Sequence, residues 1–342
     1  MSSPSHALGL YVEQKTFGHS QGAPFGAITN GWNAPISDGT LSQGFLWNEA
    51  GITYAGWSLG ALHRYDARVR YTSDTLEFMK NIKTQQPLTV GRQYNILLDI
   101  NHFEAHGVRA SYSFGDNSIW RVTVGGAYLR LDYLVSGKLV GHVVPTSDKA
   151  YDFSFDVDYF YSKDSLFDRP VAAPSGAAYT TDFSLFWRIN EPLVVRAEII
   201  DLYAKLHWPA APHTVATGNS ATKNFDANGY QYFAPAINGR ESTEAYDQPL
   251  TPRAKIDIEY HHPAFDLYQR TQYTAEQIYF ALGTAHSWQA WGTLYGFYTL
   301  SVGGWTMGWR AKDFNLEIGV GHWNPWKAHY GEARLSWHLI AI

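Results

Sequence analysis

The chain has 342 residues, no cysteine, a formal net charge of −5 and 16% aromatic residues, among them 13 Trp and 23 Tyr. A net charge of −5 argues against a protein that binds nucleic acid. No run approaches the ~18 apolar residues that a membrane helix needs. The aromatic content is high for a soluble domain but ordinary for a barrel with rings that girdle a membrane, and the absence of cysteine favours an oxidising envelope compartment.

Alternation of apolar and polar residues with a period of two recurs along the chain and predicts strands. In chain order we expect them at residues 8–17, 45–57, 59–72, 92–103, 108–114, 118–133, 138–144, 150–162, 180–189, 193–207, 253–261, 265–274, 277–285, 288–302, 314–320 and 330–339. The run from Thr72 to Ile82 instead predicts a capped helical turn. About sixteen strands, within a range of 14–18, predict an all-β fold.

The strongest strands show which face carries the charge. Residues 253–260 alternate Arg, Lys, Asp and Glu with Ala, Ile, Ile and Tyr, and residues 151–161 place Asp and Ser opposite Tyr, Phe and Val. A sheet with a hydrophobic outside and a wet inside follows, so we predict one closed antiparallel transmembrane β-barrel over residues 1–342. A soluble sandwich is the alternative, but it would carry more than 17% charged residues on its outer faces.

The connections between strands provide a second argument. Short turns are expected at 116–117, 190–192, 262–263 and 312–313, and longer segments at 163–179, 208–251 and 323–328. The two sets fall mostly on opposite ends of the predicted barrel, and we place segment 73–91 at the end with the short turns.

With these features the chain resembles Gram-negative outer-membrane β-barrels of porin-like size over nearly its whole length. The resemblance implies short periplasmic turns, long extracellular loops, and a lipid bilayer with lipopolysaccharide as surroundings. It also implies location in the bacterial outer membrane. The first residues contain no signal peptide, so we expect that an export signal has been removed.

The charged strand faces form the candidate site. In one interpretation their Arg and carboxylate groups only pair and stiffen the wall, and in the other they create a field across a water-filled lumen that selects solutes. The groups at 64–70 and 152–158 are the sharpest candidates for such a field, because they are opposite in sign. The predicted pore-lining residues are Arg64, Asp66, Arg68, Arg70, Asp99, Arg109, Asp152, Asp156, Asp158, Asp182, Arg188, Arg253, Lys255, Asp257, Glu259, Arg270, Glu332 and Arg334, with Arg121, Arg196, Glu198, Asp266 and Glu317 on neighbouring positions.

Two long segments, 18–48 and 208–251, could narrow or plug the lumen. Aromatic residues are frequent in the second, and folding into a lumen would remove their apolar area from water. An external loop that packs on itself is an equal alternative. The predicted constriction residues are Phe225, Tyr230, Tyr232, Phe233 and Arg240.

Signals for catalysis are few. Thiol chemistry is excluded by the lack of cysteine, and His102 and His106 have helical metal-site spacing on a predicted strand, where the side chains do not converge. We therefore predict no enzyme, metal or cofactor. The expected function is a channel for small hydrophilic or charged solutes. The alternatives are an export conduit or platform for a polysaccharide or extracellular protein polymer, and an enzyme that modifies lipid or glycan, for which no Ser–His pair stands out.

Overall fold

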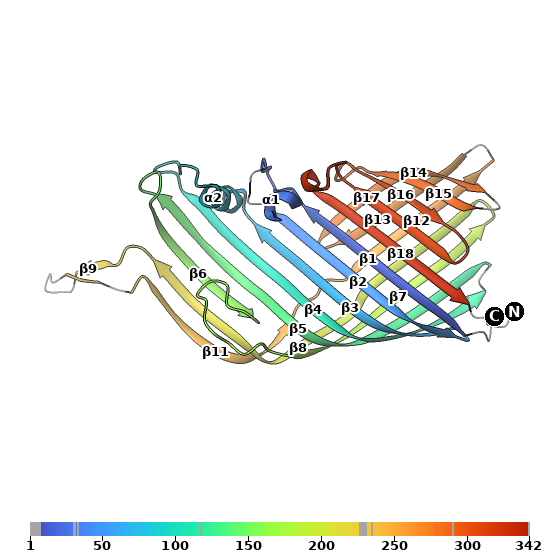
Figure 1. Ribbon diagram of the computed structural model, residues 1–342, viewed down its shortest axis with the longest axis horizontal. Coiled ribbons are helices and arrows are strands. Elements are labelled where there is room, and N and C mark those ends of the chain that lie inside the picture. Colours follow the sequence, from blue (N-terminus) through green and yellow to red (C-terminus); the bar gives the residue numbers. More distant parts are fainter. Residues whose placement is uncertain are drawn as a thin grey trace.

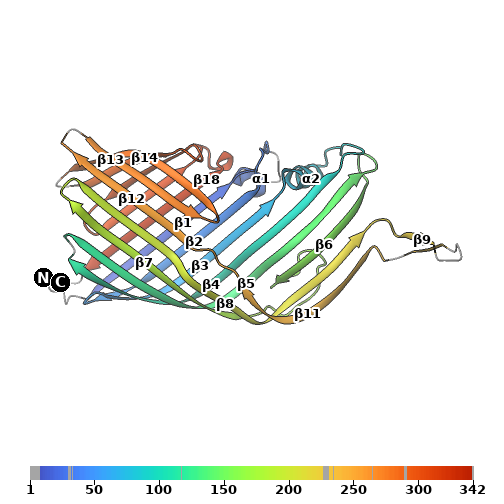
Figure 2. The same cartoon turned by 180° about the vertical axis from the view of Figure 1, so that it is seen from behind.

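Fourteen antiparallel strands close into a barrel in the computed structural model, which describes residues 8–340 except 30, 31, 33, 117, 226–230, 234, 264, 289 and 290. The first strand pairs with both the second and the last, so the sheet has no free edge within this circuit (Figures 1 and 2). The circuit consists of β1 (Gly9–Ser20), β2 (Leu41–Tyr54), β3 (Trp57–Tyr71), β4 (Tyr94–Asp116), β5 (Trp120–Pro145), β7 (Gly176–Asn190), β8 (Leu193–Asn219), β12 (Arg253–His262), β13 (Phe265–Thr274), β14 (Gln277–Trp288), β15 (Gly292–Thr299), β16 (Gly304–Arg310), β17 (Phe314–Val320) and β18 (Tyr330–Ile340).

The prediction of an all-β closed antiparallel barrel is confirmed, and its circuit lies at the lower end of the predicted range of strand numbers. Two further strands, β6 (Tyr151–Tyr161) and β11 (Ile237–Gln248), bring the sheet to sixteen strands but stand outside the closed circuit. No described helix is long and apolar enough to cross a membrane.

The two outer strands belong to a part of the sheet that continues past one rim of the barrel, which we call the extension. It consists of β6, β11 and the upper parts of β5 (133–145) and β8 (208–219), and it lies at the left of Figure 1. Residues 120–131 of β5 pair with β7, while residues 135–145, in its upper part, pair with β6. The small hairpin of β9 (Lys223–Phe225) and β10 (Gln231–Phe233) follows at its tip.

The predicted constriction loop is replaced by this extension. Residues 208–219 and 237–248 are paired strand rather than a loop folded into the lumen. The sequence did not predict β11 as a strand, because it is polar on both faces and so lacks the apolar alternation of a strand in lipid. Of the constriction residues, Phe225 lies on β9, Tyr232 and Phe233 on β10, and Arg240 on β11, whereas Tyr230 lies outside the described residues.

Helix α2 (Ser73–Thr84) confirms the predicted helical turn, because the Thr72 side chain accepts a hydrogen bond from the Thr75 amide at 3.1 Å. Its predicted position at the short-turn end is wrong. The helix lies at the opposite end from the chain termini, near α1 (Phe25–Thr29) (Figure 1). The error arises because β4 is one strand of 23 residues, which the sequence pattern split in two.

The other predicted plug segment, 18–48, includes the end of β1 and the first part of β2. Only residues 21–40 connect β1 to β2, and α1 lies there against η1 (Pro325–Lys327), with the Phe25 amide donating to the Ala328 carbonyl at 3.0 Å. A constricting role of this connection stays a prediction.

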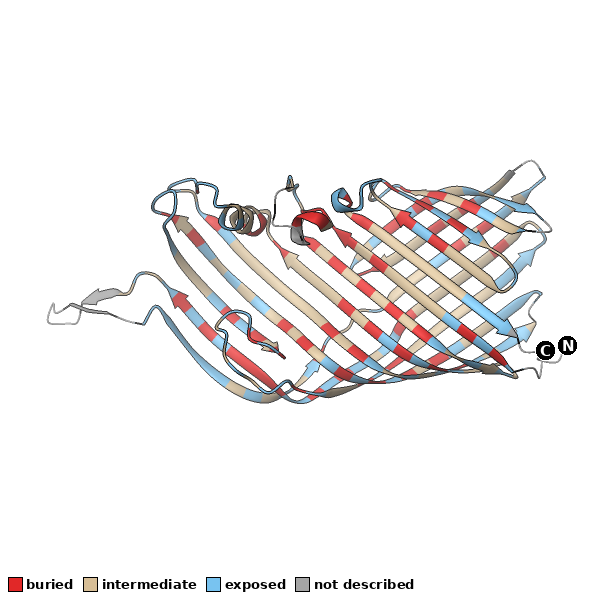
Figure 3. Ribbon diagram, viewed as in Figure 1, coloured by how far each residue is buried: buried red, intermediate tan, exposed pale blue. Residues whose placement is uncertain are grey.

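The outer wall carries apolar side chains between two rings of aromatic residues. Alternate residues along each strand are buried and more exposed, as Figure 3 shows by colour. Near the turns at the terminus end, exposed rings belong to Tyr54, Trp57, Phe114, Trp120, Trp187, Tyr260, Trp288, Trp291, Trp309 and Trp337. Toward the other end they belong to Tyr128, Tyr179, Tyr203, Trp305, Trp323 and Trp326. Two such girdles around an apolar band are characteristic of a membrane-spanning barrel.

The loop after β6 folds back over the outer face of the extension. Phe167 and Val171 pack against Tyr159 and Tyr161, and the buried Asp164 carboxylate accepts hydrogen bonds from the amides of Leu166 at 3.0 Å and Phe167 at 2.9 Å. Burial alone would raise the pKa of Asp164, but these amides and the Tyr159 hydroxyl outweigh it and lower the pKa.

Acidification should therefore loosen this loop. Because the pKa is lowered in the folded state, the stabilisation is complete above the ordinary Asp pKa of about 3.9 and is lost as the pH falls through the folded-state value. Deuterium uptake by peptides from residues 162–175, corrected for the intrinsic exchange rate, should rise from pH 7 to pH 2. The same peptides of an Asp164→Asn variant should exchange rapidly at both pH values. Equal protection of the native loop at pH 7 and pH 2 would contradict this expectation.

Candidate functional site: the charged lumen

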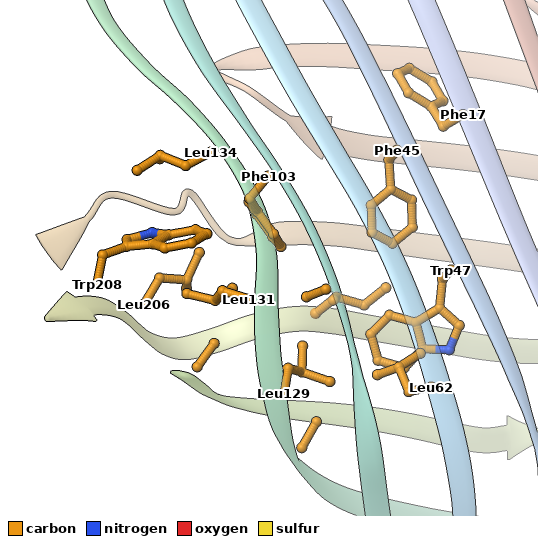
Figure 4. Close-up of a cluster of buried hydrophobic side chains, with 14 of the residues drawn as sticks. Phe17, Phe45, Trp47, Leu62, Phe103, Leu129, Leu131, Leu134, Leu206 and Trp208 are labelled. Carbon is orange, nitrogen blue, oxygen red and sulfur yellow. The ribbon is translucent and has the colours of Figure 1, made fainter. Parts of the chain in front are cut away.

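The interior of the barrel is crossed by ion pairs between strands that are not neighbours. Arg64 on β3 donates two hydrogen bonds to Asp201 on β8, at 2.6 and 2.5 Å, although three strands separate β3 from β8 around the wall. The Arg64 side chain is fully buried, and its guanidinium lies 5.6 Å from the Phe45 ring and 5.2 Å from the Phe103 ring. Figure 4 shows these two rings in their cluster of buried hydrophobic side chains. The pair of Arg64 and Asp201 therefore links two parts of the barrel wall that are not adjacent in the sheet.

Asp66 and Arg253 extend the same network. Arg64 reaches Asp66 at 3.1 Å, and Arg253 on β12 donates to Asp66 at 2.8 Å. Each carboxylate thus faces two guanidinium groups, because Arg253 also lies 3.5 Å from Asp201. Such charge-assisted pairs offset the cost of burying the charges only while all members are present.

A second network centres on Glu198 of β8. It contacts Lys15 of β1, which hydrogen-bonds to it, Arg334 of β18 at 3.2 Å, and Lys255 of β12 at 3.8 Å. Lys15 and Arg334 both also lie 3.2 Å from Glu13 on β1. The lumen is again bridged from one wall to the other, here by three cations around one carboxylate.

A third network surrounds Arg270 of β13. Its guanidinium donates to Asp257 at 2.6 Å and to Glu317 on β17 at 2.6 Å, and lies 3.8 Å from Glu332. The Phe297 ring stacks below it at 4.4 Å. All four charged side chains are nearly fully buried, so the lumen contains little free space around Arg270.

A fourth network lies nearer the chain termini. Arg109 of β4 donates to Asp182 of β7 at 2.8 Å and to Glu49 of β2 at 3.3 Å, and Glu49 accepts hydrogen bonds from Tyr11 and from the Trp47 indole. Tyr11, Trp47, Arg109 and Asp182 form part of the wall of a cavity of about 590 Å³ that opens at the terminus end, which we call the vestibule.

The vestibule and a small central cavity of about 80 Å³ share the side chains of Lys15, Ile200, Glu198, Lys255 and Arg334. The Glu198 network therefore forms the partition between them. A space of about 80 Å³ holds only a few water molecules, so little free space remains in this cavity.

Basic groups outnumber acidic ones in the vestibule. Its lining includes seven Lys or Arg residues and five Asp or Glu residues. Glu198 is shared by three cations, and Glu259, just behind the lining, by Arg196 and Arg310. Arg121 has no ion-pair partner among the described residues and lies close enough to Arg196 to be repelled by it. The lining of the vestibule thus has a small excess of basic groups.

Most of the predicted lumen residues meet in these networks. The structure brings together Arg64, Asp66, Arg109, Asp182, Arg253, Lys255, Asp257, Glu259, Arg270, Glu332 and Arg334. Arg68, Arg70 and Asp99 lie apart from them near the other rim, where Glu276 contacts both arginines. Arg188 lies exposed near the turn after β7. Whether any of them lines a conducting pore stays a prediction.

The acidic group at 152–158 does not face the arginine group across the lumen. Asp152, Asp156 and Asp158 lie on β6, which pairs with the upper part of β5 beyond the rim. Their alternation with aromatic residues was interpreted correctly as a strand, but local alternation does not tell whether a strand lies inside the closed circuit.

Several members of the networks were absent from the prediction: Glu13, Lys15, Glu49, Asp201 and Arg310. Glu13 and Lys15 could have been found, because they alternate with Leu10 and Val12. Asp201 could not, since strand parity counted from Glu198 places it on the outer face. A bulge in the β7–β8 register, with Asp201 at a φ of 61°, turns this carboxylate inward.

Comparison with known proteins finds no matching family model and no matching curated protein. Among solved structures, the P. putida toluene transporter TodX is 8% identical, with 100% of this chain and 93% of that chain covered and a TM-score of 0.43. A Pseudomonas aeruginosa FadL homologue is 8% identical over 98% and 88% of the two chains, with a TM-score of 0.39. The Escherichia coli outer membrane protease OmpT is 10% identical over 99% of each chain, with a TM-score of 0.22. At these values the likeness assigns no family and no substrate.

The closed wall itself decides the class. It combines an even number of antiparallel strands, an apolar band between two aromatic girdles, and a charged interior. The chain is a membrane-spanning β-barrel protein.

Proposed function

We propose that this barrel is a gated outer-membrane transport protein that admits small anionic solutes through the vestibule. The observation that carries the proposal is Arg121, which has no ion-pair partner in the described part of the chain and lies near Arg196 in a chamber where basic groups outnumber acidic ones. Low-dielectric walls focus this positive potential and raise the local concentration of anions. The Glu198 network is the gate, because it separates the vestibule from the central cavity.

A polar solute fits this lumen better than the hydrocarbons in the names of two similar structures, TodX and TbuX, both toluene transporters. An apolar molecule that crossed the described lumen would have to replace charge-assisted hydrogen bonds around Arg64, Glu198 and Arg270 with nothing of equal strength. A conduit for an exported polymer has less support, because the central cavity is far too small for a chain of sugars or amino acids.

The reversal potential under a salt gradient across a planar bilayer tests this proposal. The native protein should favour chloride over potassium. Arg121→Gln should reduce that preference, and high salt should weaken it because the Debye length shortens. Lys205→Gln, which removes a charge from the outer face of β8, is the matched control and should leave the preference unchanged. Cation preference in the native protein, or toluene flux without ion conductance, would overturn the proposal.

A further inference from the structure

A Ser–His–Asp arrangement lies on the extension, outside the lumen networks. Ser242 on β11, His213 on β8 and Asp158 on β6 occupy three adjacent strands. The His213 Nε2 atom lies 2.7 Å from an Asp158 carboxylate oxygen, and the His213 Nδ1 atom lies 3.4 Å from the Ser242 hydroxyl oxygen. The register explains the meeting, because Ser242 is directly opposite His213. The sequence alone did not predict this arrangement, because Ser242 and Asp158 lie 29 and 55 residues from His213 along the chain.

The imidazole is held in one orientation by its surroundings. Its ring stacks on Phe160 at 4.0 Å, and Phe160 stacks in turn on Tyr246 at 4.0 Å. The His213 side chain is 9% exposed, whereas Asp158 is 66% exposed. With Nε2–H donated to Asp158, the Nδ1 atom of a neutral ring carries the lone pair that faces Ser242.

The Ser242 hydroxyl also donates to Glu244 at 2.6 Å, and Glu244 lies 3.6 Å from His213 and from Arg240. In this resting arrangement the hydroxyl is held beside the imidazole rather than bonded to it, as catalytic hydrogen bonds often are without substrate. A rotation of the serine side chain is enough to move its proton from Glu244 toward Nδ1.

We propose that Ser242 and His213 form a hydrolytic site for carboxylic esters, with Asp158 as a positioning residue. The serine oxygen attacks the ester carbonyl while Nδ1 takes its proton, and the alcohol leaves with that proton to give an acyl-serine. Water, deprotonated by Nδ1, then releases the acid and restores the serine. Asp158 stabilises the imidazolium formed in each step.

The neighbouring groups indicate the class of ester. Arg240, 75% exposed on the same face of β11, offers a partner to an anionic group near the carbonyl. His213 and Tyr246 cover the two faces of the Phe160 ring, so the edges of this stack provide the apolar contact for the acyl group. The site thus suits a water-soluble ester with an aromatic or short acyl group and a nearby negative charge. This activity is independent of the transport proposed above, because the cluster lies outside the four lumen networks.

The test is covalent labelling of the detergent-solubilised full chain by a fluorophosphonate, with the modified residue located by mass spectrometry. The adduct should lie on Ser242 and should be absent in Ser242→Ala. His213→Gln should slow labelling at least 100-fold. Thr243→Ala, on the opposite face of the same strand, should label at the native rate and serves as the matched control.

Asp158→Asn separates positioning from a merely structural role. Labelling should slow about tenfold, because the imidazolium loses one of the carboxylates that face it, and Asp158→Glu, which keeps a carboxylate beside Nε2, should restore the native rate. The other groups around the ring are Glu244, Arg240 and Tyr246, all on β11. Heat-modified migration on gels checks that each variant has folded. No adduct on Ser242 in the folded protein, or an adduct that forms as fast in His213→Gln, would overturn the proposal.

Discussion

Replacing Arg64 by Met should lower the free energy of unfolding by about 3–5 kcal/mol, the largest effect expected of any single substitution in this barrel. The substitution keeps the long apolar stem between Phe45 and Phe103 but removes the charge. The Asp201 carboxylate, fully buried, then loses both of its short hydrogen bonds and keeps only Arg253 at 3.5 Å. Unfolding in urea from lipid vesicles measures the change.

Arg130→Met is the matched control. Arg130 also contacts a carboxylate, Asp132 at 3.5 Å, but it lies on the outer face and is 67% exposed. Exposed ion pairs contribute about 0–1 kcal/mol, so this variant should unfold almost as the native protein does. A cost below 1 kcal/mol for Arg64→Met would show that the cross-lumen pair does not stabilise the closed wall.

Placing a charge on the lipid-facing wall should have the second largest effect. Ile256 points outward from β12 and is 43% exposed, so Ile256→Arg should lower the free energy of unfolding by about 2–4 kcal/mol if the side chain lies near the bilayer midplane. The same measurement on Lys255→Ala should show a much smaller loss, because Glu198 and Asp257 keep other cationic partners. A stable Ile256→Arg variant and an unstable Lys255→Ala variant would mean that the two faces are assigned the wrong way round.

The sequence predicts well which residues of β12 face the lipid and which face the lumen. A strand with lipid on one side and charge on the other must alternate, so residues 253–260 were assigned to the correct faces without a structure. The same rule fails where the surroundings change. On β11 both faces carry polar residues, the apolar alternation disappears, and the strand was taken for a loop.

Two other features depend on contacts that no local pattern encodes. The strand β5 continues through a bulge at Asp132, which reverses the alternation between Leu131 and Leu134 and made one strand look like two. The cross-lumen partners of the predicted charges depend on which walls face each other. Arg64 was expected on the inner face, but only the closed circuit shows that the Asp201 carboxylate accepts its hydrogen bonds.

The gate is the central claim, and single-channel conductance across a planar bilayer tests it most directly. Lys15→Ser combined with Glu198→Ser shortens both side chains that divide the vestibule from the central cavity and leaves no net change in charge. Arg92→Ser combined with Glu77→Ser removes a similar ion pair in and beside α2, away from the lumen. The account predicts that the first double variant conducts several times more than the native protein and the second conducts as the native protein does. Equal conductance in all three proteins would contradict it.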